Sequence, residues 1–171
     1  DGQPFVLRWL AYRPQAVNLK LLALEEAVDV SAALALAPQI GIPTQNQLLV
    51  DRQGQLAWSP AGPLPGDGAT PQLRQPEDGR LWSANHRHLG GAGFGRLGDG
   101  GYAPAGRAVR IRDALATIDR ADEAAIAALT LDTQAPMLAR WQALLLQTLD
   151  AAALQGQPQR AEYRRLVAGE L

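Results

Sequence analysis

The stretch "GIPTQNQLLVDRQGQLAWSPAG", residues 41–62, decides the fold of the first half of the chain. Two runs of alternating apolar and polar residues flank a short polar turn, which predicts a β-hairpin. We expect its strands over residues 46–50 and 56–59. Gln53-Gly54 supplies the turn, because glycine tolerates a positive φ.

Asn46 stands at the entrance of the first strand, behind Pro43 and two further polar residues. A residue that only had to pair in a sheet would more naturally be Val or Ile. Asparagine often caps a turn with its side-chain amide, and on the residues alone we interpret Asn46 in this way. Beyond it, Leu48 and Val50 fall on one face of the strand and Leu49 on the other.

The composition limits the classes of protein to which the chain can belong. Its 171 residues suit one domain, or one domain with a helical appendage. A formal net charge of −1 gives no general attraction to nucleic acid or an anionic membrane, and no apolar run is long enough to span a bilayer. The absence of cysteine excludes disulfides and thiolate catalysis. Because the chain opens on Asp1, with neither an initiator Met nor a signal segment, we expect a piece of a longer protein.

The rest of the first half reads as a mixture of strands, helices and loops. We expect a strand over residues 5–10 and a helix capped by Asn18. Asp29 is expected to cap a second helix, because its carboxylate can accept the unpaired amides of a first helical turn. Residues 60–80 are rich in proline and glycine and predict an irregular connection, and a third strand is expected over residues 81–87.

Apolar positions recur at helical spacing through the second half of the chain. Asp119 or Asp122 is expected to cap one helix, and Thr133 is expected to cap the longest. The predicted fold class is therefore α+β. A mixed part over residues 1–105 holds the hairpin, and a helical part covers residues 106–171.

Gly93, Gly95 and Gly98 ("GFGRLG") have the G-x-G-x-x-G spacing of a dinucleotide-binding turn. Such a turn must open a helix, and no helix can start in the sequence that follows, "DGGYAP". We therefore interpret residues 89–106 as a glycine-dense surface loop.

His86 and His88 are two residues apart, a spacing that places both on one face of a strand and could ligate zinc. Asp99 lies downstream, but no third ligand stands at a suitable spacing, so we predict neither a metal nor a cofactor. Ser83 lies three residues before His86 but lacks the G-x-S-x-G turn of a hydrolase nucleophile. We interpret it as a strand serine.

Arg107, Arg110 and Arg112 gather near the start of a predicted helix, where they could hold a phosphate or a carboxylate. Only the first two share a helix face, so we interpret the group as solvated or paired charges, with Asp113 as one partner. Three of the four tryptophans lie in strand-like runs, which favours core packing: Trp9, Trp58 and Trp82.

Four segments in a fixed order resemble the penicillin acylase (penicillin amidase) family. They are "SAALALAPQIGIPTQNQLLVDRQGQLAWSPAG", "GRLWSANHR", "GDGGY…GRAVRIRDAL" and "ALTLDTQAPMLARWQALLL". Three pieces carry most of the resemblance: the Asn that opens a strand–Gly–strand hairpin, the G-x-L-x-x-A-N strand, and the L-D-x-x-A-x-x-x-A-R helix. The resemblance runs from about residue 5 to about residue 149 and is to the middle of the large β-subunit.

The resemblance implies a fragment of an αββα N-terminal-nucleophile hydrolase that cleaves the amide bond of N-acyl compounds. Such enzymes mature by self-cleavage, which exposes a Ser at the start of the β-subunit. Its α-amino group, with an unperturbed pKa of roughly 7.7–8.0, can serve as base for its own hydroxyl, which attacks the amide carbonyl and forms an acyl-enzyme. A backbone amide and an Asn side chain at the start of a strand stabilise the oxyanion. Asn46 matches that Asn, so the resemblance predicts an oxyanion donor there.

The chain departs from the family pattern at its nucleophile, because its serines, Ser31, Ser59 and Ser83, are all internal. We therefore expect the nucleophile to lie upstream and the fragment alone to be inactive. The Arg that some members carry after the hairpin is missing from "GPLPGDG", and no calcium ligand set can be matched.

The resemblance also implies the partners and the location of the protein. The partners would be the remaining α- and β-subunit segments and a small N-acyl substrate, such as a β-lactam antibiotic, with no role for nucleic acid or a membrane. The location would be periplasmic or secreted.

A second interpretation stays open, in which the chain is a non-catalytic α+β module whose helical half docks a partner protein. The two interpretations differ over Asn46 and over what precedes Asp1. A Ser behind a spacer and a signal peptide would support the hydrolase. A reading frame that begins near Asp1 would support the binding module.

Overall fold

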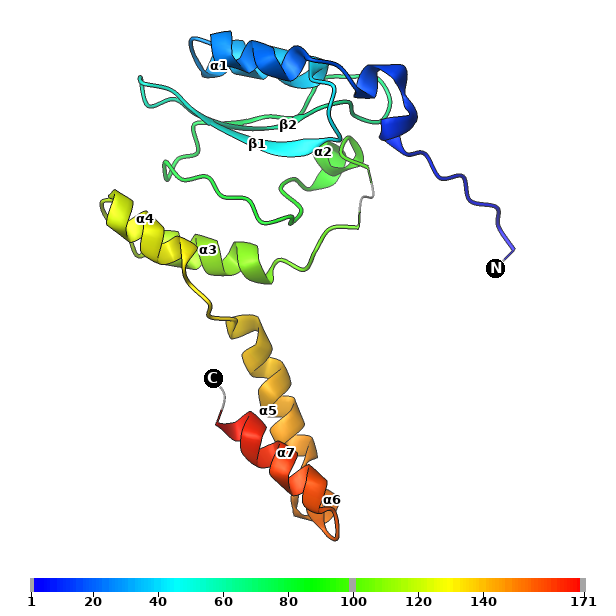
Figure 1. Cartoon of the computed structure of the whole chain (residues 1–171), viewed down its shortest axis with the longest axis vertical. Helices are drawn as coiled ribbons and strands as arrows, with labels where there is room; N and C mark the ends of the chain where they lie inside the picture. The colour runs from blue at the N-terminus through cyan, green and yellow to red at the C-terminus, as the bar shows by residue number, and fades with distance from the viewer. Residues whose placement is uncertain (1, 99–100, 170–171) are drawn as a thin grey trace. The chain divides into compact units, whose positions relative to one another are not determined.

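A computed structural model describes residues 2–98 and 101–169, which fall into two compact units (Figure 1). The first unit is Asp1–Ala103 and the second is Pro104–Leu171. A three-stranded antiparallel sheet lies in the first unit, and the second is built from helices. The predicted α+β class is therefore confirmed.

The predicted hairpin is present as strands β1, Gln45–Val50, and β2, Leu56–Ala61. The two strands pair antiparallel, with Leu48 opposite Trp58. Gly54 in the connecting turn has a φ of +77°, which is the conformation that the turn prediction required.

Asp51 ties the hairpin turn to helix α1, Val30–Leu36. Its carboxylate accepts main-chain N–H bonds from Gln55 at 2.9 Å, Gln53 at 3.0 Å and Val30 at 3.2 Å. Burial by itself would raise the pKa of Asp51, but these three donors together lower it. The side chain therefore stays ionised at neutral pH and fixes the turn against the start of the helix.

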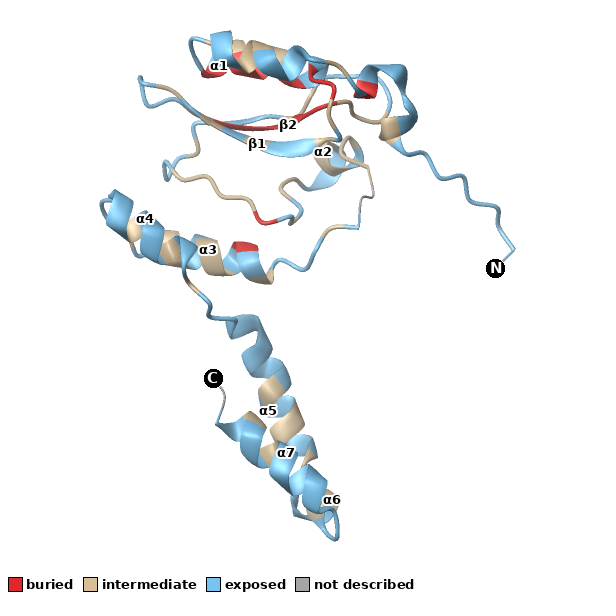
Figure 2. Ribbon diagram, in the orientation of Figure 1, coloured by how far each residue is buried: buried red, intermediate tan, exposed pale blue. Residues whose placement is uncertain are grey.

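The two faces of the hairpin have different neighbours. Odd-numbered residues face α1, where Leu49 and Ala57 pack against Leu34. Even-numbered residues face the other way, where Trp58 is 1% exposed and stacks on His88. Figure 2 shows the buried positions concentrated on β2 and on α1. The α1 face of the hairpin is therefore covered, whereas on the other face Trp58 is buried and Leu48 and Val50 stay exposed.

A third strand exists, but not where the sequence predicts it. Strand β3 is Leu73–Arg74, inside the predicted irregular connection, and it pairs antiparallel with β2. The predicted strand over residues 81–87 is wrong. Asn85 has a φ of +58°, and this left-handed residue breaks the extended alternation that a strand needs.

The predicted strand over residues 5–10 is also wrong. Residues 5–9 have no regular structure, and a 3₁₀ helix covers Leu10–Tyr12. Phe5 and Leu7 are largely exposed. A strand persists only when its main-chain groups are paired, and in the described part of the chain no strand pairs with this segment.

Hydrogen bonds of Asn18 join the start of the helical segment that follows it to residues 39–41. Asn18 Oδ1 accepts from the main-chain N–H of Lys20 at 2.9 Å and of Gly41 at 3.0 Å, and Asn18 Nδ2 donates to Gln39 O at 3.1 Å. Asn18 thus precedes a 3₁₀ helix, Lys20–Glu26, at the place where a capped helix is predicted. A Cβ on Gly41 would lie 2.2 Å from Asn18 N, so only glycine fits there.

The predicted cap of α1 is confirmed, because Asp29 Oδ1 accepts from Ala32 N at 2.7 Å. A short helix, α2, covers Gly91–Gly95 within the predicted glycine-dense loop, so that region is not wholly irregular. Two further 3₁₀ helices of the first unit are Pro14–Ala16 and Ala37–Gln39.

The second unit is helical, as the spacing predicts. Its elements are α3 (Gly106–Ala116), α4 (Glu123–Thr130), the 3₁₀ helix Pro136–Leu138, α5 (Ala139–Thr148), α6 (Ala151–Leu154) and α7 (Pro158–Ala168). Asp122, one of the two predicted caps, accepts from Ala125 N at 2.8 Å. Thr133 caps no helix, so that prediction is wrong. Among the described residues, no helix has the length and apolarity needed to cross a bilayer.

Ion pairs account for two of the three clustered arginines. Arg110 pairs with Asp132, whose pKa is lowered chiefly by the hydrogen bond from that guanidinium. Arg112 pairs with Asp113 at 2.7 Å. The interpretation of these charges as paired is confirmed for both residues.

We expect Gly41→Ala to lower the free energy of unfolding by about 1–3 kcal/mol, because the added methyl group forces main-chain atoms apart. Urea denaturation followed by tryptophan fluorescence measures the change. Gly95→Ala is the matched control, because no atom lies within 4 Å of its added Cβ. Equal stability of the two variants would contradict the close approach at Gly41.

Candidate functional site

A hollow of about 880 Å³ lies beside the start of β1 in the first unit. Its walls come from segments far apart in the sequence: residues 5–11 and 43–46, Asn85, His88, Leu97 and residues 101–103. Apolar side chains are interspersed in the lining with polar groups, which include three carboxamides (Gln45, Asn46 and Asn85), the Arg8 guanidinium and the His88 imidazole. A concave, mostly apolar surface with a few polar groups is the usual form of a small-molecule site.

Asn46 lies on the wall of this hollow, and its side chain is held by Trp58. Trp58 Nε1 donates to Asn46 Oδ1 at 3.0 Å. Asn46 is opposite Pro60 in the β1–β2 register, so Asn46 and Trp58 are diagonal neighbours on the same face of the hairpin. A buried tryptophan needs an acceptor for its indole N–H. The hairpin supplies the Asn46 carboxamide oxygen, two residues along β1 from Leu48, which is the residue opposite Trp58.

The bond to Trp58 fixes which end of the Asn46 carboxamide faces the protein. An indole N–H can only donate, so it selects the carboxamide oxygen. The Nδ2 group points elsewhere and donates to no residue within the described ranges. Asn46 is exposed, so this N–H donor is accessible. The side chain therefore bonds an indole rather than capping a turn, and its role as an oxyanion donor stays a prediction.

Asn85 is another carboxamide on the same hollow; it ends the G-x-L-x-x-A-N segment, but the sequence reasoning predicted no role for it. Its φ of +58° is uncommon for a residue with a Cβ, and such conformations gather at functional sites. Its main-chain O accepts from Ala103 N at 3.2 Å, which closes the loop around the hollow. The signal that could have found it is the Ala-Asn pair in "LWSANHR", since asparagine is the residue that most readily takes this conformation without being glycine.

His88 lines the hollow, and His86 packs against His88. The His88 ring is stacked on the Trp58 indole, with centroids 4.6 Å apart and planes 10° apart, and the His86 and His88 centroids are 4.1 Å apart. Burial lowers the pKa of both rings, and the charge of His86 lowers the pKa of His88 further. Both imidazoles are therefore neutral at pH 7, which suits a ring packed flat against an indole.

Among the described residues, no further ligand joins the two histidines to form a metal centre, and Asp99 lies outside those residues. His86 Nδ1 and His88 Nε2 are buried without a hydrogen-bond partner in the part of the chain that the structure describes. Over the same residues, no group of three or more His, Cys, Asp or Glu side chains gathers to hold a metal ion. The i,i+2 spacing does bring the two rings together, although not on a strand.

Two of the internal serines are engaged in structural contacts. Ser59 is fully buried, and its Oγ donates to Pro60 O at 3.2 Å. Ser31 Oγ accepts from Arg74 Nη1 at 3.3 Å. Neither serine is placed as an exposed nucleophile beside a base.

The G-x-G-x-x-G spacing does not form a phosphate-binding turn. Gly93 and Gly95 lie inside α2, whereas a dinucleotide turn needs its glycines before the helix. The interpretation of this spacing as incidental to a surface loop is consistent with that placement.

Arg96 brings a guanidinium to the segment "GPLPGDG", which has no Arg of its own. It donates to Pro65 O and, at 3.1 Å, to Gly68 O. Both contacts are to main-chain carbonyls, so Arg96 holds the shape of the segment that carries Pro65 to the hollow.

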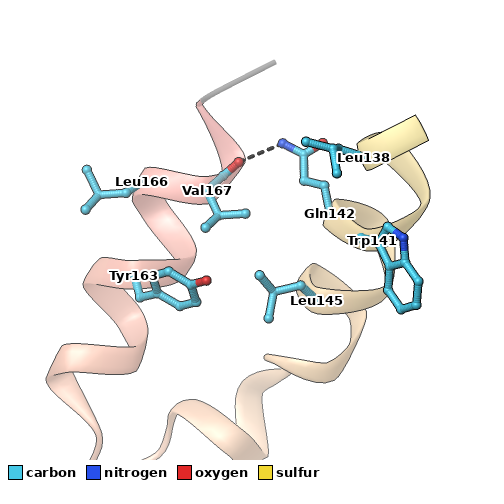
Figure 3. Close-up of a pocket in the computed structure, with 7 residues that line it drawn as sticks. All are labelled: Leu138, Trp141, Gln142, Leu145, Tyr163, Leu166 and Val167. Atoms are coloured by element: carbon cyan, nitrogen blue, oxygen red, sulfur yellow. Dashed lines mark hydrogen bonds between the residues drawn. The ribbon is translucent and has the colours of Figure 1, made fainter. Parts of the chain in front are cut away.

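A second hollow, of about 460 Å³, lies between α5 and α7 in the second unit (Figure 3). Its lining is Leu138, Trp141, Gln142, Leu145, Tyr163, Leu166 and Val167. Gln142 Nε2 donates to Val167 O at 2.7 Å, so the carboxamide donor is already used by the main chain. This hollow offers apolar surface without a pair of groups suited to acid–base chemistry. The hollow beside β1 is therefore the candidate site.

Comparison with known proteins gives the family. The family model described as penicillin amidase matches residues 1–168, so the chain belongs to the penicillin amidase family, whose members are hydrolases of amide bonds. No curated protein and no solved structure matches the chain.

The buried histidines predict a pH-dependent stability. Because their pKa values are lowered on folding, the unfolded chain binds more protons, and stability is full above the unfolded pKa of about 6.5 and falls as the pH drops below it. We expect urea midpoints that decrease as the pH is lowered from 7.5 through 5.5. His88→Phe keeps a flat ring against Trp58 without a titrating group, so its slope should be shallower. An unchanged slope in the double variant His86→Phe, His88→Phe, which contains no histidine, would assign the pH dependence to other groups.

Proposed function

We propose that the chain is part of a larger enzyme that hydrolyses the amide bond of N-acyl compounds through an acyl-enzyme. Membership of the penicillin amidase family supports this reaction class. The hollow beside β1 supports a place for this chain in the site, because its wall combines apolar side chains with carboxamide donors. The observation that carries the proposal is the Asn46 side chain, exposed on that wall with its oxygen already bonded.

Amide hydrolysis places negative charge on the carbonyl oxygen in the tetrahedral intermediate. A neutral N–H donor that is already oriented stabilises this charge without having to reorganise, and removing one such donor typically costs about 10²–10³ in kcat, or about 2.7–4 kcal/mol. A carboxamide on a sheet suits this task because the strand fixes its Cα and a hydrogen bond to its oxygen fixes its plane. Asn46 meets both conditions through β1 and Trp58.

Asn85 offers the same chemical group on the same hollow, and so competes for the same role. The hydrogen bond from Trp58 is a structural role that by itself explains an asparagine at position 46. Asn85 has a left-handed backbone, a conformation that gathers at functional sites. The proposal therefore places an oxyanion donor on this wall, assigns it to Asn46, and names Asn85 as the residue that holds the role if Asn46 does not.

The remaining parts of the proposed enzyme come from outside these 171 residues. The nucleophile is a Ser exposed by self-cleavage at the start of a β-subunit, and the chain alone is inactive. Its partners are the other segments of the α- and β-subunits together with a small N-acyl substrate, and the mature enzyme is periplasmic or secreted. These features follow from the family resemblance of the sequence.

The test is the turnover of the complete enzyme carrying Asn46→Ala or Asn85→Ala. We expect Asn46→Ala to lower kcat about 10²–10³-fold, with a smaller change in KM, because an oxyanion donor acts in the transition state. Hydrolysis of a chromogenic N-acyl amide measures both constants. Gln53→Ala is the matched control, because it removes a carboxamide from the exposed hairpin turn.

The outcomes separate the parts of the proposal. A large loss in Asn85→Ala alone would move the donor to Asn85. Unchanged kcat in both variants would remove this wall from the oxyanion site. Electrophoresis of the matured subunits shows whether either variant instead blocks self-cleavage.

A further inference from the structure

The ring of His88 occupies a position that the proposed function does not yet use. It lies parallel to the Trp58 indole, with centroids 4.6 Å apart and planes 10° apart. Trp58 Nε1 in turn donates to Asn46 Oδ1 at 3.0 Å. His88 belongs to residues 81–90, which form neither helix nor strand, whereas the other two residues lie on the hairpin. Side chains from two separate segments therefore form one series of contacts that ends at the proposed oxyanion donor.

The hydrogen bond alone does not fix the indole. It holds one point on the edge of the Trp58 ring, and N–H···O bonds tolerate a wide range of angles. The ring could still roll about the line from Nε1 to the Asn46 oxygen. A flat group against the indole face prevents this motion, because rolling would drive one edge of the indole into that group. In this structure the flat group is the His88 imidazole.

The plane of the indole sets the plane of the Asn46 carboxamide. A carboxamide is planar, so its oxygen and its Nδ2 move together. The indole N–H holds the oxygen, and a tilt of the indole therefore changes the direction in which Nδ2 donates. Stabilisation of an oxyanion requires a donor that is already oriented when the charge develops. A loose indole would weaken the donor without removing it.

His88 is itself held in place. Its Nε2 is buried and has no partner within the described ranges, and main-chain groups of His86 and Trp82 hydrogen-bond the ring. The His86 ring packs against it, with centroids 4.1 Å apart. Burial is the largest influence on the pKa of His88 and lowers it, so the ring is neutral at pH 7. A neutral, fixed, flat ring suits a position against a buried indole.

We propose that His88 is a positioning residue for the oxyanion donor: its stacked ring fixes the Trp58 indole, and the indole fixes the Asn46 carboxamide. This inference rests on the proposed function, because it assumes that Asn46 is the donor. His88 touches no reacting atom in this account. Its effect on catalysis passes entirely through the other two side chains.

The experiment is the turnover of a chromogenic N-acyl amide by the complete enzyme carrying His88→Ala, His88→Leu or His88→Phe. Active sites are counted with an irreversible reagent for the nucleophilic Ser, so that kcat refers to folded, matured enzyme. We expect His88→Ala and His88→Leu to lower kcat about 10–100-fold with little change in KM, because a misplaced donor is lost mainly in the transition state. His88→Phe restores a flat ring and should recover most of kcat. His88→Leu is its matched control, because it fills the space without a flat ring.

A double-mutant cycle tests whether His88 acts through Asn46. In Asn46→Ala no donor remains to be positioned, so adding His88→Ala should change kcat by less than about twofold. A loss of the same size in both backgrounds would overturn the proposal, because His88 would then act independently of Asn46. Equal kcat in His88→Leu and His88→Phe would overturn it too, because the flat ring would have no effect.

The same measurements separate this inference from the proposed function. Unchanged kcat in all three His88 variants, together with the expected loss in Asn46→Ala, would overturn the positioning role and leave the donor in place. Unchanged kcat in Asn46→Ala would overturn the donor assignment and the positioning role with it.

Discussion

The buried indole of Trp58 is the constraint on which the candidate site depends. Trp58 is 1% exposed, so its indole N–H needs an acceptor within the protein, and the β1–β2 register places the Asn46 carboxamide oxygen diagonally across from it at 3.0 Å. One hydrogen bond therefore satisfies a buried donor and sets the plane of an exposed amide. The stacked His88 closes the other side of the indole, so the hairpin, the imidazole pair and the wall of the hollow form one packed assembly. A shift of register by one residue would move Trp58 to the α1 face and release Asn46.

The hairpin divides the first unit into two chemically different halves. The α1 side is small and apolar, with Leu34 and Ala57 in close contact. The other side carries the tryptophan, the histidines and both asparagines of the hollow. This division gives the chain an apolar layer that fixes the strands and a layer that carries the polar side chains of the hollow. The apolar groove between α5 and α7 has no comparable set of polar groups.

Local signals in the sequence were enough to predict the hairpin, the Asp29 cap and the helical second half. Each depends on neighbouring residues: Gly54 for the turn, a carboxylate three residues before an amide, and apolar spacing. The failures depend on distant partners. Residues 5–10 have strand-like composition but no paired neighbour in the described structure, and β3 exists only because Leu73 and Arg74 meet β2. The position of Asn46 at a strand entrance predicted only a turn cap, and the oxyanion role came from the family resemblance and stays a prediction. The place of Asn85 could not be predicted, because its left-handed backbone turned a predicted strand into a loop.

The most direct measurement is hydrogen exchange at the four tryptophan indole N–H groups, followed by NMR. If the bond between Trp58 and Asn46 organises the site, the Trp58 indole should exchange far more slowly than that of Trp141, which is 64% exposed. In Asn46→Ala the Trp58 indole should exchange faster, while the other indoles keep their rates. Exchange of Trp58 as fast as that of Trp141 in the unaltered chain, or an unchanged rate in Asn46→Ala, would contradict the central role of this bond.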